Sequence, residues 1–152
     1  MDPRSEVVLR QQEFLSGSVL LVNAPCDELN TQLIGTVEPH FWTWNFNELQ
    51  YFQNQQSDVH FGTDLPDVAF DQAIVFVPKS KELLNYVLHQ LVSRLAVGAS
   101  IFLVGEKKGG VERASKQLQP FGKTLKLDSA RHCQMWQIVK KKTVTAKPLA
   151  DW

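Results

Sequence analysis

The stretch from Asp71 to Glu106 constrains the fold more than any other, because it predicts two buried strands joined by an amphipathic helix. The apolar run 74–77 is typical of a strand that is covered on both faces. Pro78 is expected to end this strand, since proline cannot donate to a ladder. A second apolar run, 101–104, follows the helix. Strands joined in this way lie parallel, with a right-handed crossover.

The helix between these strands has clear start and end signals. Ser80 is a suitable N-cap, and Glu82 falls in the first turn, where the helix dipole favours an acidic side chain. Gly98 is suited to the position just after the helix end. His89 is expected on the solvent side. Apolar side chains recur at helical spacing and form one stripe: Leu83, Leu84, Val87, Leu88, Leu91, Val92 and Leu95.

The remaining segments alternate between helix and strand patterns, and the last two strands follow each other without a helix. The predicted elements are a helix 5–14 capped by Ser5, a strand 19–22, a helix 28–34, an aromatic strand 40–46, a short helical or irregular segment 48–54, a weak strand 59–62, a surface helix 111–120, and strands 124–127 and 133–139. Six or seven strands in this order predict a Rossmann-like α/β fold of the class I methyltransferase kind. Its sheet is mostly parallel and ends in an antiparallel hairpin.

Charge is distributed unevenly along the chain. The 152 residues contain 16 basic and 16 acidic side chains, so the net charge does not indicate a polyanionic partner. Residues 1–78 nevertheless hold 2 basic and 11 acidic residues, whereas residues 79–152 hold 14 basic and 5 acidic ones. This pattern predicts a polarised surface if the halves stay apart in the fold, and an averaged field if they interleave.

Two cysteines, Cys26 and Cys133, indicate free thiols in a reducing compartment and form a poor zinc site without clustered histidines. The amino-terminal residues carry charges and have no apolar core typical of a signal peptide. No segment approaches the ~18 apolar residues of a membrane span. We therefore expect a cytoplasmic protein without a membrane or metal partner.

The turns where a methyltransferase would do its chemistry lack the necessary residues. Turn 23–27 after the first strand contains no glycine, and Pro25 removes a backbone donor, so no cofactor is expected there. The aromatic strand ends with only Asn45 to bind ribose. Methyltransferases that modify exocyclic amines use Asn-Pro-Pro-aromatic after the central strand. Here only Pro78 matches, and Val77 cannot accept a hydrogen bond from its side chain.

Three segments carry a resemblance to a known family: FDQAIVFVPKSK, IFLVGEKKGGVERASKQL and LDSARHCQMWQ. Over residues 5–140 the chain resembles the N-terminal domain of the bacterial 16S ribosomal RNA guanine-N2 methyltransferases of the C type. In that family two methyltransferase-like domains stand in tandem, and the C-terminal one carries the cofactor loop and the Asn-Pro-Pro-Phe motif. The resemblance implies that the N-terminal domain is degenerate and supports folding of its partner and RNA binding.

The resemblance also implies a domain organisation. Residues 1–139 would be the non-catalytic domain, and residues 140–152 a linker towards a C-terminal catalytic domain. The partners would be that catalytic domain and 16S rRNA or the small ribosomal subunit. The parent enzyme would use S-adenosylmethionine, whereas this chain alone would be inactive, without catalytic, cofactor-binding or metal-binding residues.

Basic side chains near two strand ends are the candidate RNA contacts. Lys107 and Lys108 precede two glycines and a helix start, which is typical of a phosphate site but also of a solvated turn. Arg131, beside His132, suits either a contact to RNA or a partner domain, or a structural loop. The candidate set is Lys79, Lys81, Lys107, Lys108, Arg113 and Arg131.

Two further patterns invite functional interpretations. His132 and Cys133 are adjacent on a strand and so point to opposite faces, which argues against a catalytic pair. Trp42, Trp44 and Phe46 alternate on one face of their strand, where packing in a core or against another domain is favoured over base stacking.

Two rival functions remain open. The chain can be a self-sufficient methyltransferase with an atypical cofactor loop, or a folding and interaction module without RNA contact.

Overall fold

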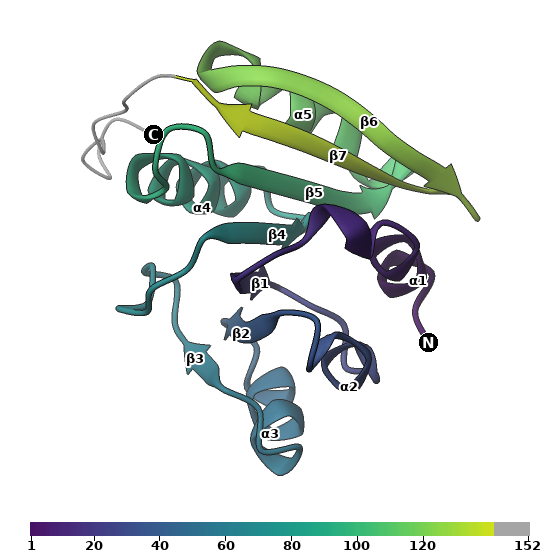
Figure 1. The fold of residues 1–152 in the computed structure, drawn as a ribbon, viewed down its shortest axis with the longest axis vertical. Coiled ribbons are helices and arrows are strands. Elements are labelled where there is room, and N and C mark those ends of the chain that lie inside the picture. Colours follow the sequence, from purple (N-terminus) through teal and green to yellow (C-terminus); the bar gives the residue numbers. More distant parts are fainter. Residues whose placement is uncertain (142–152) are drawn as a thin grey trace.

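The computed structural model describes residues 1–141, which form one seven-stranded sheet in the order β3-β2-β1-β4-β5-β7-β6 (Figure 1). The elements are α1 (Pro3–Arg10), η1 (Gln12–Phe14), β1 (Ser18–Val22), α2 (Leu29–Leu33), β2 (Glu38–Thr43), α3 (Phe46–Asn54), β3 (Val59–Phe61), β4 (Gln72–Phe76), α4 (Lys81–Arg94), β5 (Ser100–Glu106), η2 (Lys107–Gly109), α5 (Val111–Leu118), η3 (Gln119–Phe121), β6 (Gly122–Ala130) and β7 (Cys133–Lys140). The strands from β3 to β5 pair in parallel, whereas β7 pairs antiparallel with β5 and β6. The expected sheet, mostly parallel with a C-terminal hairpin, is confirmed.

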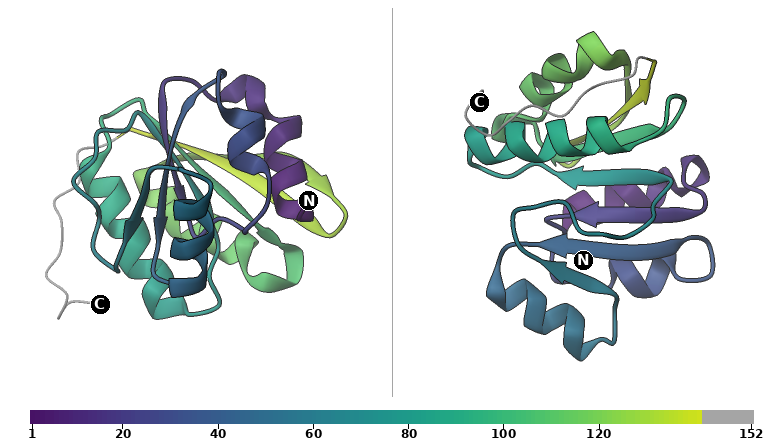
Figure 2. Two further views of the ribbon diagram at one scale, coloured as in Figure 1. Left: turned by 90° about the horizontal axis from the view of Figure 1, so that it is seen from below. Right: turned by 90° about the vertical axis from the view of Figure 1, so that its left-hand side faces the viewer.

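Successive side chains of the strands point to opposite faces of the sheet and pack into two separate hydrophobic cores. Val19 and Leu21 of β1 pack with side chains of α1, α2 and α3, whereas Leu20 and Val22 pack with those of α4 and α5. The left view of Figure 2 shows α1 and α2 on one side of the sheet and α4 on the other. All four of these β1 side chains are fully buried. Burial of such a side chain stabilises a fold by roughly 1.5–3 kcal/mol, so both faces hold the sheet in place.

The central β4-α4-β5 unit forms as expected. Ser80 caps α4, and its hydroxyl oxygen accepts the Leu83 N–H at 3.2 Å. The helix ends at Arg94, so Gly98 is not the residue after its end; with φ of 94° it instead shapes the turn before β5. The solvent-side prediction for His89 is wrong, because burial extends around α4 beyond the apolar stripe and leaves this residue 7% exposed.

The first helix begins earlier than the sequence indicated. Asp2, not Ser5, is the N-cap of α1, and its carboxylate accepts the Arg4 N–H at 2.8 Å. Pro3 follows at the first helical position, which proline tolerates because that N–H has no partner within a helix. Ser5 is instead completely buried. Residues 12–14 form a separate 3₁₀ turn.

The aromatic strand is shorter than predicted, because a helix cap interrupts it. The side chain of Asn45 accepts the N–H groups of Asn47 and Glu48, so Phe46 is the first residue of α3. Trp42, Trp44 and Phe46 therefore do not share a strand face. Trp42 is buried, and its ring N–H donates to the Gly62 carbonyl at 2.7 Å, whereas Phe46 is 61% exposed.

The C-terminal hairpin is longer than expected. Lys140, predicted to open the linker, is the last residue of β7; it is buried, and its ammonium donates to the Leu95 carbonyl at 2.5 Å. Burial lowers the pKa of Lys140. The rest of the predicted linker, from residue 142 onward, lies outside the described residues.

Gly122 opens β6 directly over the backbone of β7. A Cβ atom at this position would lie 1.8 Å from the Val139 carbonyl oxygen. The strand pairing therefore requires glycine here because of space and not because of its φ, which is extended at 173°.

We predict that Gly122→Ala lowers the free energy of unfolding by about 2–3 kcal/mol, because the extra methyl group forces the two strands apart. Urea denaturation followed by circular dichroism measures this change. Gly109→Ala is the matched control: its Cβ would meet only the Glu106 Cβ at 3.6 Å, so a change within about 0.5 kcal/mol is expected. Equal effects of the two substitutions would contradict the steric explanation.

Candidate functional site

The carboxyl ends of β1, β4 and β5 meet at one edge of the sheet, together with the start of α1 and the β6–β7 turn. Two hollows open there, and Glu106 lines both. The strand-end hollow, of about 270 Å³, is lined by Arg4, Asn23, Val77, Pro78, Lys79, Gly105, Glu106 and Gly109. The hairpin hollow, of about 400 Å³, is lined by Asp2, Pro3, Glu106, Lys107, Lys108, Arg131, His132 and Cys133.

Asn23 occupies the position where a cofactor loop would begin. Its backbone has a positive φ of 61°, and its side-chain amide donates to the Phe76 carbonyl at 2.9 Å. This bond ties the end of β1 to the end of β4. Asparagine adopts the left-handed region more readily than most side chains, so the turn forms without glycine. The strand ends are therefore held together by a side chain.

Arg4 reaches into the same region from α1. Its guanidinium makes two hydrogen bonds of 3.0 Å to the Asp2 carboxylate and lies 6.0 Å from the centre of the Phe76 ring. The Asp2 N–H in turn donates to Asp27 at 3.1 Å, beside the first turn. Burial alone would raise the pKa of Asp2, but the bonds to Arg4 hold it below its usual value. The start of α1 is thus fixed at this edge by charged pairs.

The sequence prediction missed both Arg4 and Glu48. Glu48, in the first turn of α3, reaches back to accept the Thr43 hydroxyl at 2.8 Å, and burial raises its pKa. An acidic side chain therefore does lie at the end of β2, supplied from the following helix. The pattern of Asn45 followed three residues later by Glu48 was the available signal, since it is typical of a helix start.

Four of the six predicted contact residues line one hollow or the other: Lys79, Lys107, Lys108 and Arg131. The Arg113 guanidinium lies against Gly110, because a Cβ there would be 2.8 Å from one of its nitrogens. Lys81, the first residue of α4, is exposed and lines neither hollow. We refer to Lys79, Lys107, Lys108, Arg113 and Arg131 as the basic rim.

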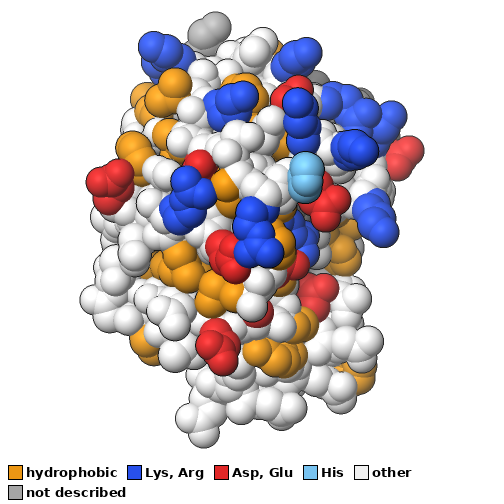
Figure 3. Space-filling view, turned by 90° about the vertical axis from the view of Figure 1, so that its right-hand side faces the viewer, with side chains coloured by type: hydrophobic (Ala, Val, Ile, Leu, Met, Phe, Trp, Pro, Cys, Tyr) orange, Lys and Arg blue, Asp and Glu red, His pale blue; other side chains and the backbone are white. Residues whose placement is uncertain are grey.

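The acidic and basic halves of the chain supply neighbouring parts of the sheet, and they meet where α1 packs against β5 and β7. Residues 1–78 supply β1 to β4, and residues 79–141 supply α4, α5 and the neighbouring strands β5, β7 and β6. Figure 3 shows Lys and Arg side chains gathered in the upper half of one face. Basic side chains are therefore concentrated on one part of this face, and the five residues of the basic rim all come from the basic half of the chain.

The β6–β7 turn presents Arg131 and His132 beside the hairpin hollow. The Arg131 guanidinium lies 2.6 Å from the Glu6 carboxylate of α1, and the His132 carbonyl accepts the Lys107 N–H at 2.8 Å. The neighbouring Cys133 is buried, and burial raises the pKa of its thiol, which disfavours the thiolate that a nucleophile requires.

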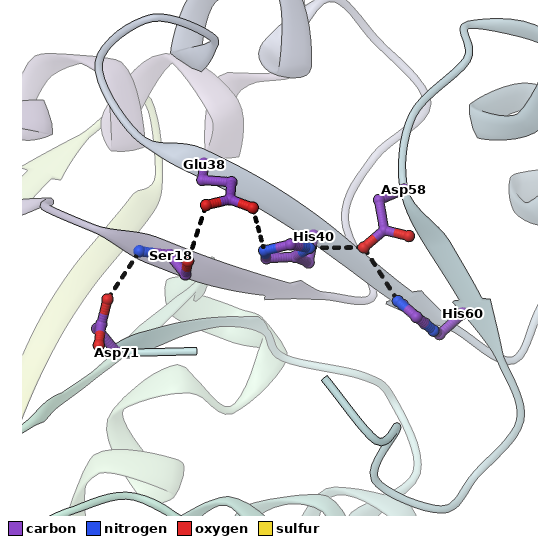
Figure 4. A network of polar contacts seen from close by, with 6 residues as sticks. All are labelled: Ser18, Glu38, His40, Asp58, His60 and Asp71. Carbon is purple, nitrogen blue, oxygen red and sulfur yellow. Dashed lines mark hydrogen bonds and ion pairs between the residues drawn. The ribbon is translucent and has the colours of Figure 1, made fainter. Parts of the chain in front are cut away.

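A second polar cluster lies at the opposite edge of the sheet (Figure 4). The Asp58 carboxylate contacts His40 at 2.6 Å and His60 at 3.1 Å, which joins the edge strand β3 to β2. Burial alone would raise the pKa of Asp58, but these histidines hold it below its usual value. Glu38 continues the network to the start of β1, where it accepts the Ser18 hydroxyl at 3.2 Å.

Among residues 1–141 no group of histidine, cysteine and carboxylate side chains is arranged to hold a metal ion.

Comparison with known sequences gives a consistent set of relatives. Residues 5–152 match the family model described as methyltransferase small domain N-terminal. Over all 152 residues the chain is 60% identical to the ribosomal RNA small subunit methyltransferase C of Acinetobacter baumannii, and covers 45% of it. It is 49% identical over 150 residues to the protein of that name from Pseudomonas putida, covering 98% of this chain and 44% of the relative. The chain thus spans less than half the length of these relatives.

Solved structures share the fold. The 16S rRNA N2 methyltransferase of T. thermophilus, in complex with AdoMet and guanosine, matches with a TM-score of 0.78 at 18% identity, over 97% of this chain and 41% of that one. An rRNA methylase from Streptococcus thermophilus matches with a TM-score of 0.63 at 11% identity, over 86% and 92% of the two chains. The fold is therefore that of class I methyltransferases.

None of the helices within residues 1–141 has the length and apolar character needed to cross a bilayer.

We predict that Asn23→Ala lowers the free energy of unfolding by about 2 kcal/mol. About half of this loss comes from the hydrogen bond to Phe76 and half from placing alanine at positive φ. Asn23→Gly removes the bond but adopts this φ freely, so about 1 kcal/mol is expected. Urea denaturation of both variants checks the difference; a larger loss for glycine than for alanine would refute the assignment of the left-handed backbone.

Proposed function

The chain belongs to the methyltransferase small domain N-terminal family, and we propose that it is the non-catalytic N-terminal domain of an S-adenosylmethionine-dependent 16S rRNA guanine-N2 methyltransferase. Its role is to support a C-terminal catalytic domain and to hold RNA through the basic rim. The observation that carries this proposal is the side-chain bridge of Asn23 across the strand ends, where a cofactor-binding domain needs an open turn.

The residues at this edge do not fit S-adenosylmethionine. A cofactor that lies over the end of β1 needs a turn without side chains. Here the Asn23 side chain extends from the end of β1 to the end of β4 and donates to the Phe76 carbonyl. The Arg4 guanidinium lines the same hollow, held by Asp2, and its positive charge disfavours a sulfonium ion. Val77 also stands where an amide would hold the target amine. These features support a domain that neither binds the cofactor nor transfers the methyl group.

The basic rim supports the RNA part of the proposal. Lys107 and Lys108 are exposed, lie between β5 and α5, and have Arg113 one helical turn away. Such clustered cations bind phosphate groups without reading sequence, and phosphate contacts fix the register of a nucleic acid. The base-specific and chemical steps would then belong to the catalytic domain.

Two alternatives make different predictions. A self-sufficient methyltransferase would bind S-adenosylmethionine and methylate RNA with this chain alone. A folding and interaction module would bind the catalytic domain but would be indifferent to charge at the basic rim.

In titration calorimetry, we expect this chain to bind S-adenosylmethionine with a Kd weaker than about 1 mM, because the side chains of Asn23 and Arg4 lie where the cofactor needs an open turn. The full-length relative from Acinetobacter baumannii, measured under the same conditions, provides the positive control. A micromolar Kd for the 152-residue chain would favour the self-sufficient enzyme.

We predict that Lys107→Glu with Lys108→Glu weakens binding of a 16S rRNA fragment about tenfold at ~0.1 M salt. The slope of log affinity against log salt should fall by about two, since two phosphate contacts are lost. Fluorescence anisotropy with labelled RNA across a salt series measures both quantities.

The matched control is Lys123→Glu with Lys141→Glu, which changes the net charge equally. Both side chains are exposed and lie at the far end of the hairpin, roughly 23 Å along the strand from the Arg131 turn. An equal loss in both pairs would indicate attraction by net charge alone. Unchanged affinity in both would favour the interaction module.

A further inference from the structure

The hairpin hollow combines cationic side chains from two sides with an apolar interior. Lys107 and Lys108 approach it from η2, and Arg131 and His132 approach it from the β6–β7 turn. The Lys107 N–H to His132 carbonyl bond of 2.8 Å fixes these two segments to each other. Pro3 of α1 and the buried Cys133 complete the wall. The arrangement therefore depends on three elements that are distant in sequence.

The turn that presents Arg131 and His132 adopts an unfavourable backbone for these residues. Their φ angles are 54° and 66°, so two consecutive non-glycine residues occupy the left-handed region. Two-residue hairpin turns of this kind prefer Asn-Gly, which adopts these angles with little strain. Strained backbone that persists in a fold is a reason to ask what its side chains do. Here they place a guanidinium and an imidazole at the mouth of the hollow.

The carboxylates around the hairpin hollow do not prevent an anion from binding there. The Asp2 carboxylate is already paired with Arg4 at 3.0 Å. Arg131 is paired with Glu6 at 2.6 Å, but both side chains are exposed, and such pairs contribute little in water. A phosphate group can therefore replace Glu6 as the partner of Arg131. Glu106 also lines the hollow and favours an orientation with the phosphate on the side of the two lysines and the hairpin turn.

We propose that the hairpin hollow binds one unstacked nucleotide of single-stranded RNA, an inference that rests on the proposed RNA-binding function. Its phosphate lies between the two lysines and Arg131, and its ribose and base enter the hollow against Pro3 and Cys133. The volume of about 400 Å³ falls within the range of small-molecule sites, whereas a phosphate group alone needs far less space. A base can enter only where it is unpaired, as in the loops and bulges that proteins recognise in RNA.

The test replaces the strained turn by the relaxed one, Arg131→Asn with His132→Gly, in the 152-residue chain. The urea midpoint should rise, because Asn-Gly suits the turn, while affinity for a labelled hexanucleotide RNA should fall about fivefold to tenfold. Arg131→Lys, which keeps the charge, should retain most of the affinity. A turn with only a structural role would give the rise in stability without the loss of affinity.

The outcome separates this inference from the proposed function. If the Asn-Gly chain binds RNA normally while glutamates at Lys107 and Lys108 weaken binding, the nucleotide site is overturned and the basic rim stands. If neither change weakens binding, both are overturned.

A measurement on the unaltered chain does not depend on how the variants fold. In ¹⁵N NMR titrations, guanosine 5′-monophosphate and the hexanucleotide should shift the Lys107, His132 and Cys133 amides, and inorganic phosphate should shift them less. Equal shifts with phosphate alone would indicate an anion site and overturn the nucleotide assignment, as would no shift with any probe.

Discussion

Burial of the parallel strands on both faces is the constraint on which the rest of the structure depends. Side chains of β1, β4 and β5 are almost completely excluded from water, and they alternate between a core under α1, α2 and α3 and a core under α4 and α5. Because the apolar residues of these strands contribute to one core or the other, a change in register would expose apolar side chains on both faces. The methyltransferase framework is therefore kept by packing, whether or not the strand ends do chemistry.

The polar residues at the strand ends are not members of these cores, so core packing does not determine their identity. At the end of β1, the Asn23 side chain forms a hydrogen bond to the end of β4. At the end of β4, Val77 and Lys79 flank Pro78. Arg4, held by Asp2, lines the hollow between these ends. Asn23 and Arg4 make polar contacts that strengthen the domain at the place where a cofactor-binding domain needs an open turn. The same edge carries the basic rim, so the turns without cofactor-loop residues and the proposed RNA contacts lie at one place in the fold.

The limits of sequence prediction lie at the element boundaries and at the edge of the sheet. The pattern of strand and helix, the parallel central unit and the C-terminal hairpin followed from apolar periodicity. The early start of α1 and the end of the aromatic strand before Phe46 were not predicted. Each depends on one capping side chain, Asp2 or Asn45, whose effect is not visible in the pattern of apolar residues. The requirement for glycine at position 122 comes from the nearby Val139 carbonyl of a strand distant in sequence, so no local pattern indicates it.

The sequence by itself determined the fold class, because buried strands and an amphipathic helix leave few ways to cover apolar surface. It also determined what the strand-end turns lack, since the absence of a glycine or an amide is a local fact. Only the tertiary structure decided which charged groups meet. Arg4, Glu48 and Glu6 reach the strand ends from helices, and Arg131 and Lys107 line the same hollow although they are distant in sequence. Such contacts depend on how distant segments pack, and no spacing along the chain specifies that.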